Sequence, residues 1–375
     1  MSAFLSHSWL VSPALLIGGF ATSAIIAFLT SWLAVSGGPV DKPRDRGSHQ
    51  QPTPTSGGLA VMAATAIVSG GLMWLFHDQI PGKAIDGLLL LGFAGLMGLS
   101  GGIDDLTGLP ARLRLLFQVG LCVAFAVFYR VTSLDFGFGL SFDVWSPLGL
   151  IGSAAWLVLG INAINFMDGS NGLAVGTQAM ALMAMAVLTV LLASSTLLGF
   201  YIGLPLIILA CASGAHFGFL PVNLPMGRAF QGDAGSLFGG ALITGACLQL
   251  KTYGVASVWF GGFLLAPLLV DVVLTLTIRA LQRKPLMEAH KEHLYQLWLQ
   301  RKNASHGRLA LWVWNLTALS ALVGVAARYI DETWKTDIRF PVLVVLVAGL
   351  SVAWFAIRRY LLRLEPLNGP TRSNP

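Results

Sequence analysis

Long uncharged segments separated by short polar loops recur along the whole chain. No Asp, Glu, Lys or Arg precedes Asp41, and none occurs between Gly169 and Gly227. A helix needs about 20 mainly apolar residues to cross the hydrocarbon core of a bilayer, so these segments predict membrane-spanning helices. We predict eleven spans: Trp9–Val35, Gly57–Phe76, Gly87–Ile103, Leu115–Tyr129, Pro147–Met167, two spans within residues 169–227 that turn back at Ala193–Thr196, Ala234–Leu250, Val255–Ile278, Leu309–Ala327 and Phe340–Ile357.

The composition agrees with an all-α, polytopic membrane protein. Of the 375 residues, 55% are hydrophobic and only 11% are charged, whereas soluble domains carry about 25% charged residues. This excludes a soluble enzyme, a disordered tail, a secreted disulfide scaffold and a nucleic-acid-binding domain. The cysteines, Cys122, Cys211 and Cys247, lie inside apolar segments and form no C-x-x-C pair, so neither a zinc site nor a disulfide framework is indicated.

The basic residues predict how the chain is oriented. With the N-terminus outside, 17 Lys and Arg residues fall on the inner side and 6 on the outer side. Because inner loops of membrane proteins are enriched in Lys and Arg, we expect an outside N-terminus and a cytoplasmic C-terminus.

The polar segments outside the spans are short, with one exception. Ala280–Gly307 is the only long polar loop, and Glu288–Lys302 within it is expected to form an amphipathic helix along the inner membrane surface. Residues 364–375 form a short cytoplasmic tail. No internal repeat is evident, so we treat residues 1–375 as one integral membrane domain.

Two adjacent carboxylates, Asp104 and Asp105, end the third predicted span. Neighbouring carboxylates repel each other unless a cation or a proton intervenes. The pair therefore indicates a divalent metal site, a general base, or both. A solvated turn with a helix-capping aspartate is the alternative interpretation.

A second polar group ends the fifth predicted span. Asn162, Asn165 and Asp168 recur every three residues and so share one helix face, and Asn171 follows in a turn. Amides and carboxylates on an otherwise apolar span are costly unless they have a function.

A third polar group precedes the eighth predicted span. Asn223 and Phe230 lead into a Gly-Asp-Ala-Gly-Ser turn that contains Asp233. Free backbone N–H groups at a helix start bind phosphate, and the carboxylate can hold the metal that accompanies it. Simple helix capping is the alternative.

A fourth polar group lies in the long loop, which holds three of the seven histidines: His290, His293 and His306. Together with Lys291 they suit a basic, hydrogen-bonding clamp for a diphosphate better than a soft-metal site, and a solvated amphipathic helix is the alternative. All four groups fall on the predicted cytoplasmic side, and the outer loops carry nothing comparable. The sequence therefore predicts one shared cytoplasmic active site.

In this order, the four groups resemble the motifs of the polyprenyl-phosphate N-acetylhexosamine-1-phosphate transferases. The resemblance runs from about Asp41 to Arg308 and includes Pro52–Gly58, which is similar to the family's first cytoplasmic loop. It implies transfer of a sugar 1-phosphate from a UDP-N-acetylhexosamine to undecaprenyl phosphate, with release of UMP, in the bacterial cytoplasmic (inner) membrane. It also implies Mg²⁺, with Mn²⁺ as a substitute, contact with membrane lipids but not with nucleic acid, and it leaves a homodimer open.

The resemblance also implies roles for individual residues. The catalytic residues would be Asp104, Asp105 and Asp168, with Asp104 taking the proton from the lipid phosphate or orienting it. Direct transfer and a two-step route through an aspartyl-phosphate are both open at this point. The metal would be bound by Asp233 and Asn165. The nucleotide and diphosphate contacts would be Asn171, Asn223, Phe230, Lys291 and His293.

Three departures from the family patterns bear on the branch. Asn171 stands where the family usually has a second carboxylate. Gly108 stands where the phospho-N-acetylmuramoyl-pentapeptide transferases have Lys. Tyr295 and Gln296 stand where those enzymes have further histidines. These differences favour the branch that starts O-antigen or related surface polysaccharides of lipopolysaccharide.

A secondary transporter of an anionic or lipid-linked solute is the alternative function. Asp271, about two helical turns inside the ninth span, would then be a coupling site. Transporters usually show two similar halves and broken helices near the midplane, and the sequence shows neither.

Overall fold

The computed structural model describes residues 11–35, 40–41, 53–80, 84–193, 203–288, 290–302, 304–334 and 336–364. Helices dominate this part of the chain, which confirms the predicted all-α class. The helices are α1 (Pro13–Ala34), α2 (Gly57–Leu75), α3 (Ala84–Thr107), α4 (Ala111–Phe128), α5 (Ser146–Phe166), α6 (Leu173–Ala193), α7 (Gly203–Asn223), α8 (Gly232–Thr252), α9 (Phe260–Leu281), α10 (Leu294–Lys302), α11 (His306–Trp334) and α12 (Arg339–Arg363), with a short 3₁₀ helix, η2 (His77–Gln79).

Each of the eleven predicted spans coincides with one of the long helices. Ten helices among the described residues are long and apolar enough to cross a membrane, so the chain is a multi-pass membrane protein. The one predicted span outside these ten helices is the eighth, α8, which has 21 residues, 17 of them buried. Because α8 is surrounded by other helices, it carries the small and polar residues that allow close helix packing instead of lipid-facing hydrocarbon.

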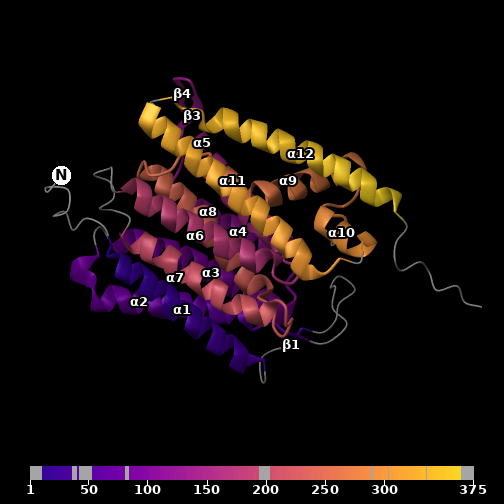
Figure 1. Cartoon of the computed structure of the whole chain (residues 1–375), viewed down its shortest axis with the longest axis horizontal. Helices are drawn as coiled ribbons and strands as arrows, with labels where there is room; N and C mark the ends of the chain where they lie inside the picture. The colour runs from indigo at the N-terminus through magenta and orange to yellow at the C-terminus, as the bar shows by residue number, and fades with distance from the viewer. Residues whose placement is uncertain are drawn as a thin grey trace, which may run out of the picture.

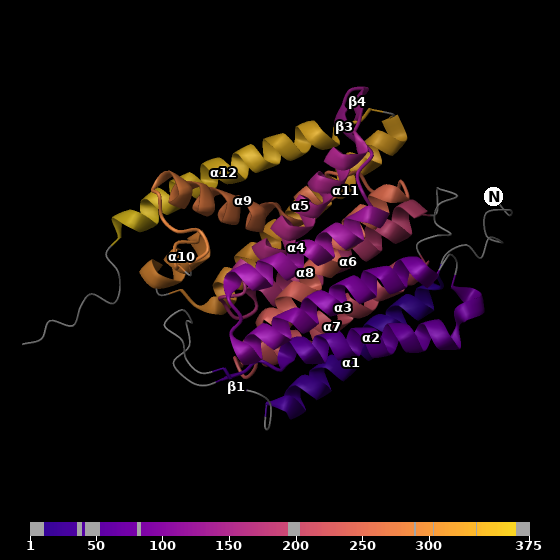
Figure 2. The same cartoon turned by 180° about the vertical axis from the view of Figure 1, so that it is seen from behind.

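The helices form a bundle around α8 (Figure 1). α8 contacts α2, α3, α5, α6, α7 and α9. Seen from either side, α1 and α2 form one flank, and α9, α11 and α12 form the other (Figures 1 and 2). α12 is the most peripheral span, with only 6% of its apolar window buried, and the rest of that window is free to face lipid.

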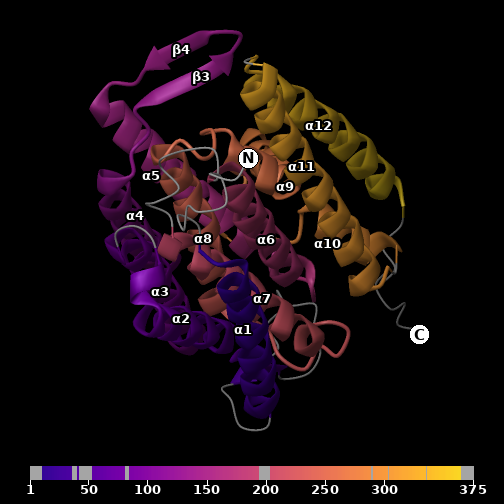
Figure 3. The same ribbon diagram turned by 60° about the vertical axis from the view of Figure 1, so that its left-hand side comes forward.

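Two antiparallel strand pairs lie at opposite ends of the bundle. β1 (Val40–Asp41) pairs with β2 (Thr53–Pro54) beside the ends of α1 and α2. β3 (Ser133–Gly137) and β4 (Leu140–Asp143) form a hairpin that projects from the other end (Figure 3). The hairpin was not predicted from the sequence. A backbone hydrogen bond attaches its turn to the segment before α12: the N–H of Phe138 donates to the carbonyl oxygen of Asp337 at 3.0 Å.

The long polar loop folds differently from the prediction. The helix begins at Leu294, six residues later than the predicted start at Glu288, and its residues Tyr295 and Leu297 are buried. α10 therefore packs against other parts of the protein through these side chains, and its place along the membrane surface stays a prediction. The predicted turn at residues 194–196, most of the first inner loop and the tail beyond residue 364 lie outside the described residues.

Helices α1 and α7 approach closely through two glycines spaced four apart. A Cβ atom on Gly214 would lie 2.1 Å from the carbonyl oxygen of Phe20, and one on Gly218 would lie 2.0 Å from that of Ala24. Small residues at this spacing let the backbones of membrane helices pack directly together.

We expect Gly218→Ala to destabilise the bundle by about 1–3 kcal/mol, because the added methyl group overlaps a backbone atom that cannot move aside. Thermal unfolding of the detergent-solubilised protein measures this effect. Gly71→Ala is the matched control, since no atom lies within 4 Å of its Cβ position. Equal midpoints for the two variants would contradict the proposed packing.

Candidate active site

Four chain segments meet at the end of the bundle opposite the hairpin. At their centre, one guanidinium nitrogen (Nη1) of Arg114 on α4 donates to Asp104 on α3 and, at 2.9 Å, to Asp233 on α8. Asp104 and Arg114 are separated by 10 residues in sequence, and Arg114 and Asp233 by 119. The predicted convergence of the aspartate pair with Asp233 is therefore found.

Asp105 connects α3 to the first turn of α8. Its carboxylate accepts the backbone N–H groups of Asp233 at 3.2 Å and Ala234 at 3.3 Å. Gly232 adopts a φ of +61°, and a Cβ there would lie 2.4 Å from the Asp105 carboxylate. Asp105 thus caps α8 and positions Asp233, a role that the sequence analysis did not predict.

Asp168 lies in the turn between α5 and α6 and joins the same group. The side-chain amide of Gln231 donates to its Oδ1 at 2.9 Å. Desolvation, with Asp233 and Asp105 nearby, raises the pKa of the Asp168 carboxyl well above its usual value. Asp168 is therefore the acidic side chain of this turn that faces the other carboxylates.

Asn165 contacts Asp233 through its amide nitrogen, which donates to Oδ1 at 2.8 Å and to the Ser236 hydroxyl at 2.9 Å. In this arrangement Asn165 orients the carboxylate that we predicted as a metal ligand. Its own predicted place as a ligand stays a prediction.

Asn171 and Asn223, whose contact with the nucleotide stays a prediction, lie in the loop before α6 and at the end of α7. Buried Asn223 accepts the backbone N–H of Gly172 at 2.6 Å and donates to the carbonyl oxygen of Ala229 at 3.0 Å. The side chain of Asn171 lies against Gly227, and its buried Oδ1 makes no hydrogen bond to the described residues. Asn223 fixes the loop geometry, whereas Asn171 keeps an acceptor for a ligand.

Phe230 lies between the α7–α8 loop and the first inner loop. Its backbone N–H donates to the carbonyl oxygen of Pro54 at 2.8 Å, and its own carbonyl accepts from Gly57 at 3.1 Å. The residue is half-buried, and these two bonds join the α7–α8 loop to the first inner loop. Its stacking on a base stays a prediction.

The loop that leads into α10 contains His290 and His293, and we call it the histidine loop. It lies beside the Asp168 turn, because Tyr295 at the start of α10 bonds to Phe166. Lys291 is exposed, whereas His293 is buried and its ring stacks between those of Phe166 and Tyr295. Burial, followed by the nearby Arg279 and Arg358, lowers the pKa of His293 to about 4. At neutral pH this imidazole is uncharged, so Lys291 is the cation of the predicted clamp.

The carboxylates fit a magnesium ion whose remaining ligands would come from water and from a phosphate substrate. Asp104 and Asp233 already direct oxygens to one cationic nitrogen, and Oδ1 of Asp104 is buried without a partner among the described residues. No three His, Cys, Asp or Glu side chains in the described part of the chain form a closed metal cage. Mg²⁺ usually takes only one or two carboxylates, with water and phosphate oxygens completing its coordination.

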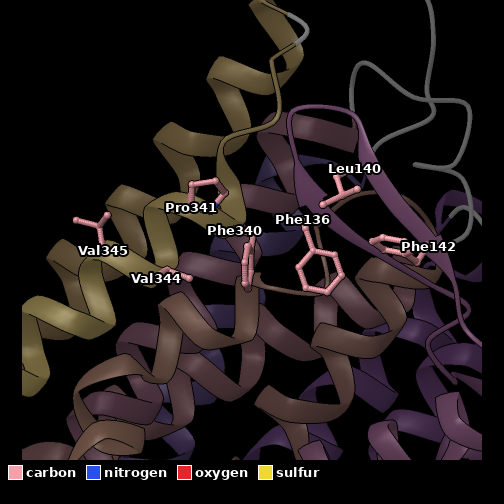
Figure 4. A pocket seen from close by; sticks show the side chains of 7 residues that line it. All are labelled: Phe136, Leu140, Phe142, Phe340, Pro341, Val344 and Val345. Carbon is pink, nitrogen blue, oxygen red and sulfur yellow. The ribbon is translucent and has the colours of Figure 1, made fainter.

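A separate apolar groove of about 630 Å³ lies at the hairpin end (Figure 4). Its lining offers neither an acid nor a base, so it is excluded as the catalytic centre. The lining residues are Phe136, Leu140, Phe142, Phe340, Pro341, Val344 and Val345.

Comparison with known proteins identifies the family. The family model described as "Glycosyl transferase family 4" matches residues 87–251, a range that contains Asp104, Asp168 and Asp233. A phospho-N-acetylmuramoyl-pentapeptide-transferase of Mycobacterium sp. (strain KMS) is 31% identical over 320 residues, which cover 76% of this chain and 86% of the relative. The chain belongs to glycosyl transferase family 4. It is thus a polyprenyl-phosphate N-acetylhexosamine-1-phosphate transferase.

The relatives carry names from two branches of this family. A decaprenyl-phosphate N-acetylglucosaminephosphotransferase of Mycolicibacterium smegmatis is 28% identical over 357 residues, covering 89% of this chain and 87% of the relative. A phospho-N-acetylmuramoyl-pentapeptide-transferase of Desulforamulus reducens is 30% identical over 305 residues, covering 76% and 85%. Family membership replaces the transporter alternative, and Asp271 is fully engaged in hydrogen bonds.

Three residues of the candidate site were not predicted from the sequence as site residues: Arg114, Gln231 and Tyr295. One signal was available for Arg114, because a basic residue close to several carboxylates at a membrane boundary is expected to pair with them. Gln231 and Tyr295 carry no such signal, since their contacts depend on how distant loops meet.

Arg114 supplies the positive charge that offsets the carboxylates when no divalent ion is bound. We expect Arg114→Gln to raise the dependence of stability on Mg²⁺, because uncompensated like charges destabilise the fold. The measurement is the gain in thermal midpoint on adding millimolar Mg²⁺ to protein treated with EDTA. Arg112→Gln is the control, since Arg112 is exposed two residues away. An equal gain for wild type and Arg114→Gln would contradict this role.

Buried His293 makes the protein sensitive to acid. An unfolded chain protonates this residue below its ordinary pKa of about 6.5, whereas the folded site resists protonation until about pH 4. The free energy of unfolding therefore falls as the pH decreases from about 6.5 to about 4. We expect His293→Asn to flatten this slope in thermal unfolding scans. His77→Asn, at an exposed position, should leave the slope unchanged, and an unaltered slope in His293→Asn would count against the assignment.

Proposed function

We propose that this family 4 enzyme transfers N-acetylhexosamine 1-phosphate from a UDP-sugar to undecaprenyl phosphate, releasing UMP. One observation carries the proposal: α3, α4 and α8 bring Asp104, Arg114 and Asp233 together at one end of the bundle. Phosphoryl transfer depends mainly on placing its reactants and neutralising their charge, and this arrangement supplies groups for both. The names of the relatives support the substrate classes.

The lipid phosphate oxygen attacks the β-phosphorus of the UDP-sugar, and the bond from that phosphorus to the bridging oxygen breaks. UMP leaves with the bridging oxygen, and the lipid carries the sugar diphosphate. The unpartnered Oδ1 of Asp104 receives the proton of the lipid phosphate or orients that group. Asp233 would hold a bound Mg²⁺, which would supply positive charge against the diphosphate. Asn171 and Phe230 contact uracil, and Lys291 contacts the phosphates.

Position 108 supports the lipopolysaccharide or surface-polysaccharide branch. Gly108 has a φ of +65°, and its N–H closes the end of α3 on the carbonyl oxygen of Asp104 at 2.8 Å. This conformation suits glycine and strains a residue with a long side chain. The turn is therefore unsuited to the lysine that the pentapeptide enzymes have at this position. We therefore propose an N-acetylhexosamine as the sugar, with an O-antigen-type glycan as the product.

The site faces the cytoplasm in this proposal. Arg112, Arg228, Lys284 and Arg308 accompany the carboxylates at the same end of the bundle, and positive residues favour the inner side of the membrane. A cytoplasmic site gives direct access to a soluble nucleotide sugar, while the lipid phosphate arrives from the surrounding inner leaflet.

The decisive experiment incubates purified protein in nanodiscs with undecaprenyl phosphate, Mg²⁺ and a panel of UDP-N-acetylhexosamines. Release of UMP and the mass of the lipid product are both measured. The proposal requires a lipid-linked N-acetylhexosamine diphosphate that disappears when the lipid phosphate is omitted or EDTA is added. Turnover of UDP-N-acetylmuramoyl-pentapeptide alone would place the enzyme in the other branch.

We expect Asp104→Asn and Asp233→Asn each to reduce turnover by roughly a hundredfold or more, the scale of removing one electrostatic stabiliser. The folded fraction in gel filtration should stay near that of wild type. Asp143→Asn is the matched control because this carboxylate lies on the exposed strand β4 at the opposite end. Near-normal transfer by either active-site variant would refute its assigned role.

A further inference from the structure

One buried carboxylate lies outside the group of four. Asp271 on α9 is only 4% exposed, and its two oxygens accept the backbone N–H of Leu294 at 2.8 and 3.0 Å. The indole N–H of Trp354 on α12 donates to it at 2.8 Å, and the Thr275 hydroxyl at 3.2 Å. A single side chain thereby joins α9, α10 and α12.

We propose that Asp271 is a positioning residue for the transfer reaction, which caps the N-terminus of α10 and thereby fixes the histidine loop against the Asp168 turn. The activity part of this inference rests on the proposed function. Asp271 touches no substrate in this scheme and acts through the backbone of Leu294 and the side chains that follow it.

α10 needs a cap that its own sequence does not supply. The first N–H groups of a helix have no partner within the helix, and Ser, Thr, Asp or Asn usually precedes the first turn to accept them. Here the preceding residue is His293, whose backbone N–H itself donates to the Gln296 side chain at 3.2 Å. Asp271 therefore fulfils the capping role from another helix, and its negative charge suits the positive end of the α10 dipole.

The capped turn transmits this placement to the catalytic group through Tyr295. The Tyr295 hydroxyl donates to the carbonyl oxygen of Phe166 at 3.1 Å, and a Cβ on Gly169 would lie 2.2 Å from the same hydroxyl. Asp168 lies between these two backbone positions. A shift at the start of α10 therefore moves the Tyr295 ring that holds the Asp168 turn.

The loop before α10 is held by separate contacts. Arg279 donates to the Glu292 carboxylate and to the carbonyl oxygen of Pro285, each at 2.7 Å. Arg358 donates to the carbonyl oxygen of Glu292 at 2.6 Å. These contacts fix the loop up to Glu292, and Asp271 binds the backbone N–H of Leu294 at the first position of α10.

The test compares Asp271→Leu, which removes both acceptor oxygens at nearly the same side-chain volume, with wild type by hydrogen exchange and by turnover. We expect amide exchange across residues 290–302 to rise at least about tenfold, while peptides of α3 and α8 keep their protection. Turnover should fall by roughly tenfold to a hundredfold, as for a displaced catalytic geometry. Thr275→Val is the matched control, because it removes one donor to Asp271 and leaves the cap intact. Unchanged exchange across 290–302 in Asp271→Leu overturns the proposal.

A second variant breaks the same contact from the other partner. Leu294→Pro removes the donated N–H at the first position of α10, where proline is compatible with the helix, and leaves α9 untouched. It should reproduce the loss of protection across residues 290–302. If Asp271→Leu does not fold, this variant alone decides the question, and full protection in it rules out the cap.

A double-mutant cycle separates positioning from general destabilisation. If Asp271 acts through α10, then Asp271→Leu on a Tyr295→Phe background should cost less activity than it costs alone, because both substitutions release the same turn. Losses that multiply independently overturn the positioning role. If wild type transfers no sugar phosphate, the proposed function fails, while the exchange measurements still decide whether Asp271 holds α10.

Discussion

The balance of charge among buried groups at one end of the bundle constrains the rest of the structure. Asp104, Asp105, Asp168 and Asp233 gather there, and Arg114 is the cation that bonds directly to two of them. Carboxylates withdrawn from water are stable only with cations, hydrogen-bond donors or protons beside them. Each neighbour of the group meets part of this requirement: Asn165, Gln231 and the first turn of α8 all direct N–H groups inward.

Helix ends supply the rigidity that this site needs. Asp104 and Asp105 close α3, Asp168 follows α5, and Asp233 opens α8. Because the helices pack along their whole length, their ends are fixed relative to one another, and loops of a few residues inherit that order. Close approaches at Gly58 and Gly101, where a Cβ would lie 2.1 Å from the Gln231 backbone and 2.3 Å from the Asp233 backbone, bring α2 and α3 directly against the start of α8.

The sequence predicted the helices well because each span had to be apolar over a fixed length. It also predicted that the carboxylates would converge, since all four groups fell on one side of the membrane. It could not predict that Asp105 caps α8 or that Asn223 joins two loops, because a carboxylate or an amide in a motif looks the same whether it contacts substrate or backbone. The β3–β4 hairpin was missed for a different reason: it depends on contacts with Asp337 and Trp259, which are distant in the sequence.

The polar residues of the site differ in whether their side chains bond to the protein or remain available to a substrate. In the proposed function this difference follows from where the two substrates come from. A nucleotide sugar arrives from water, so the groups that would meet it, Lys291 and Asn171, keep a charge or an acceptor available. The lipid phosphate would arrive from the membrane and meet the end of α3, where buried Asp104 has an oxygen without a partner among the described residues. The side chains of four other residues are committed to neighbouring groups of the protein: Asp105, Asn165, Asn223 and Asp271. Such commitment is what keeps the carboxylates at a fixed geometry before either substrate binds.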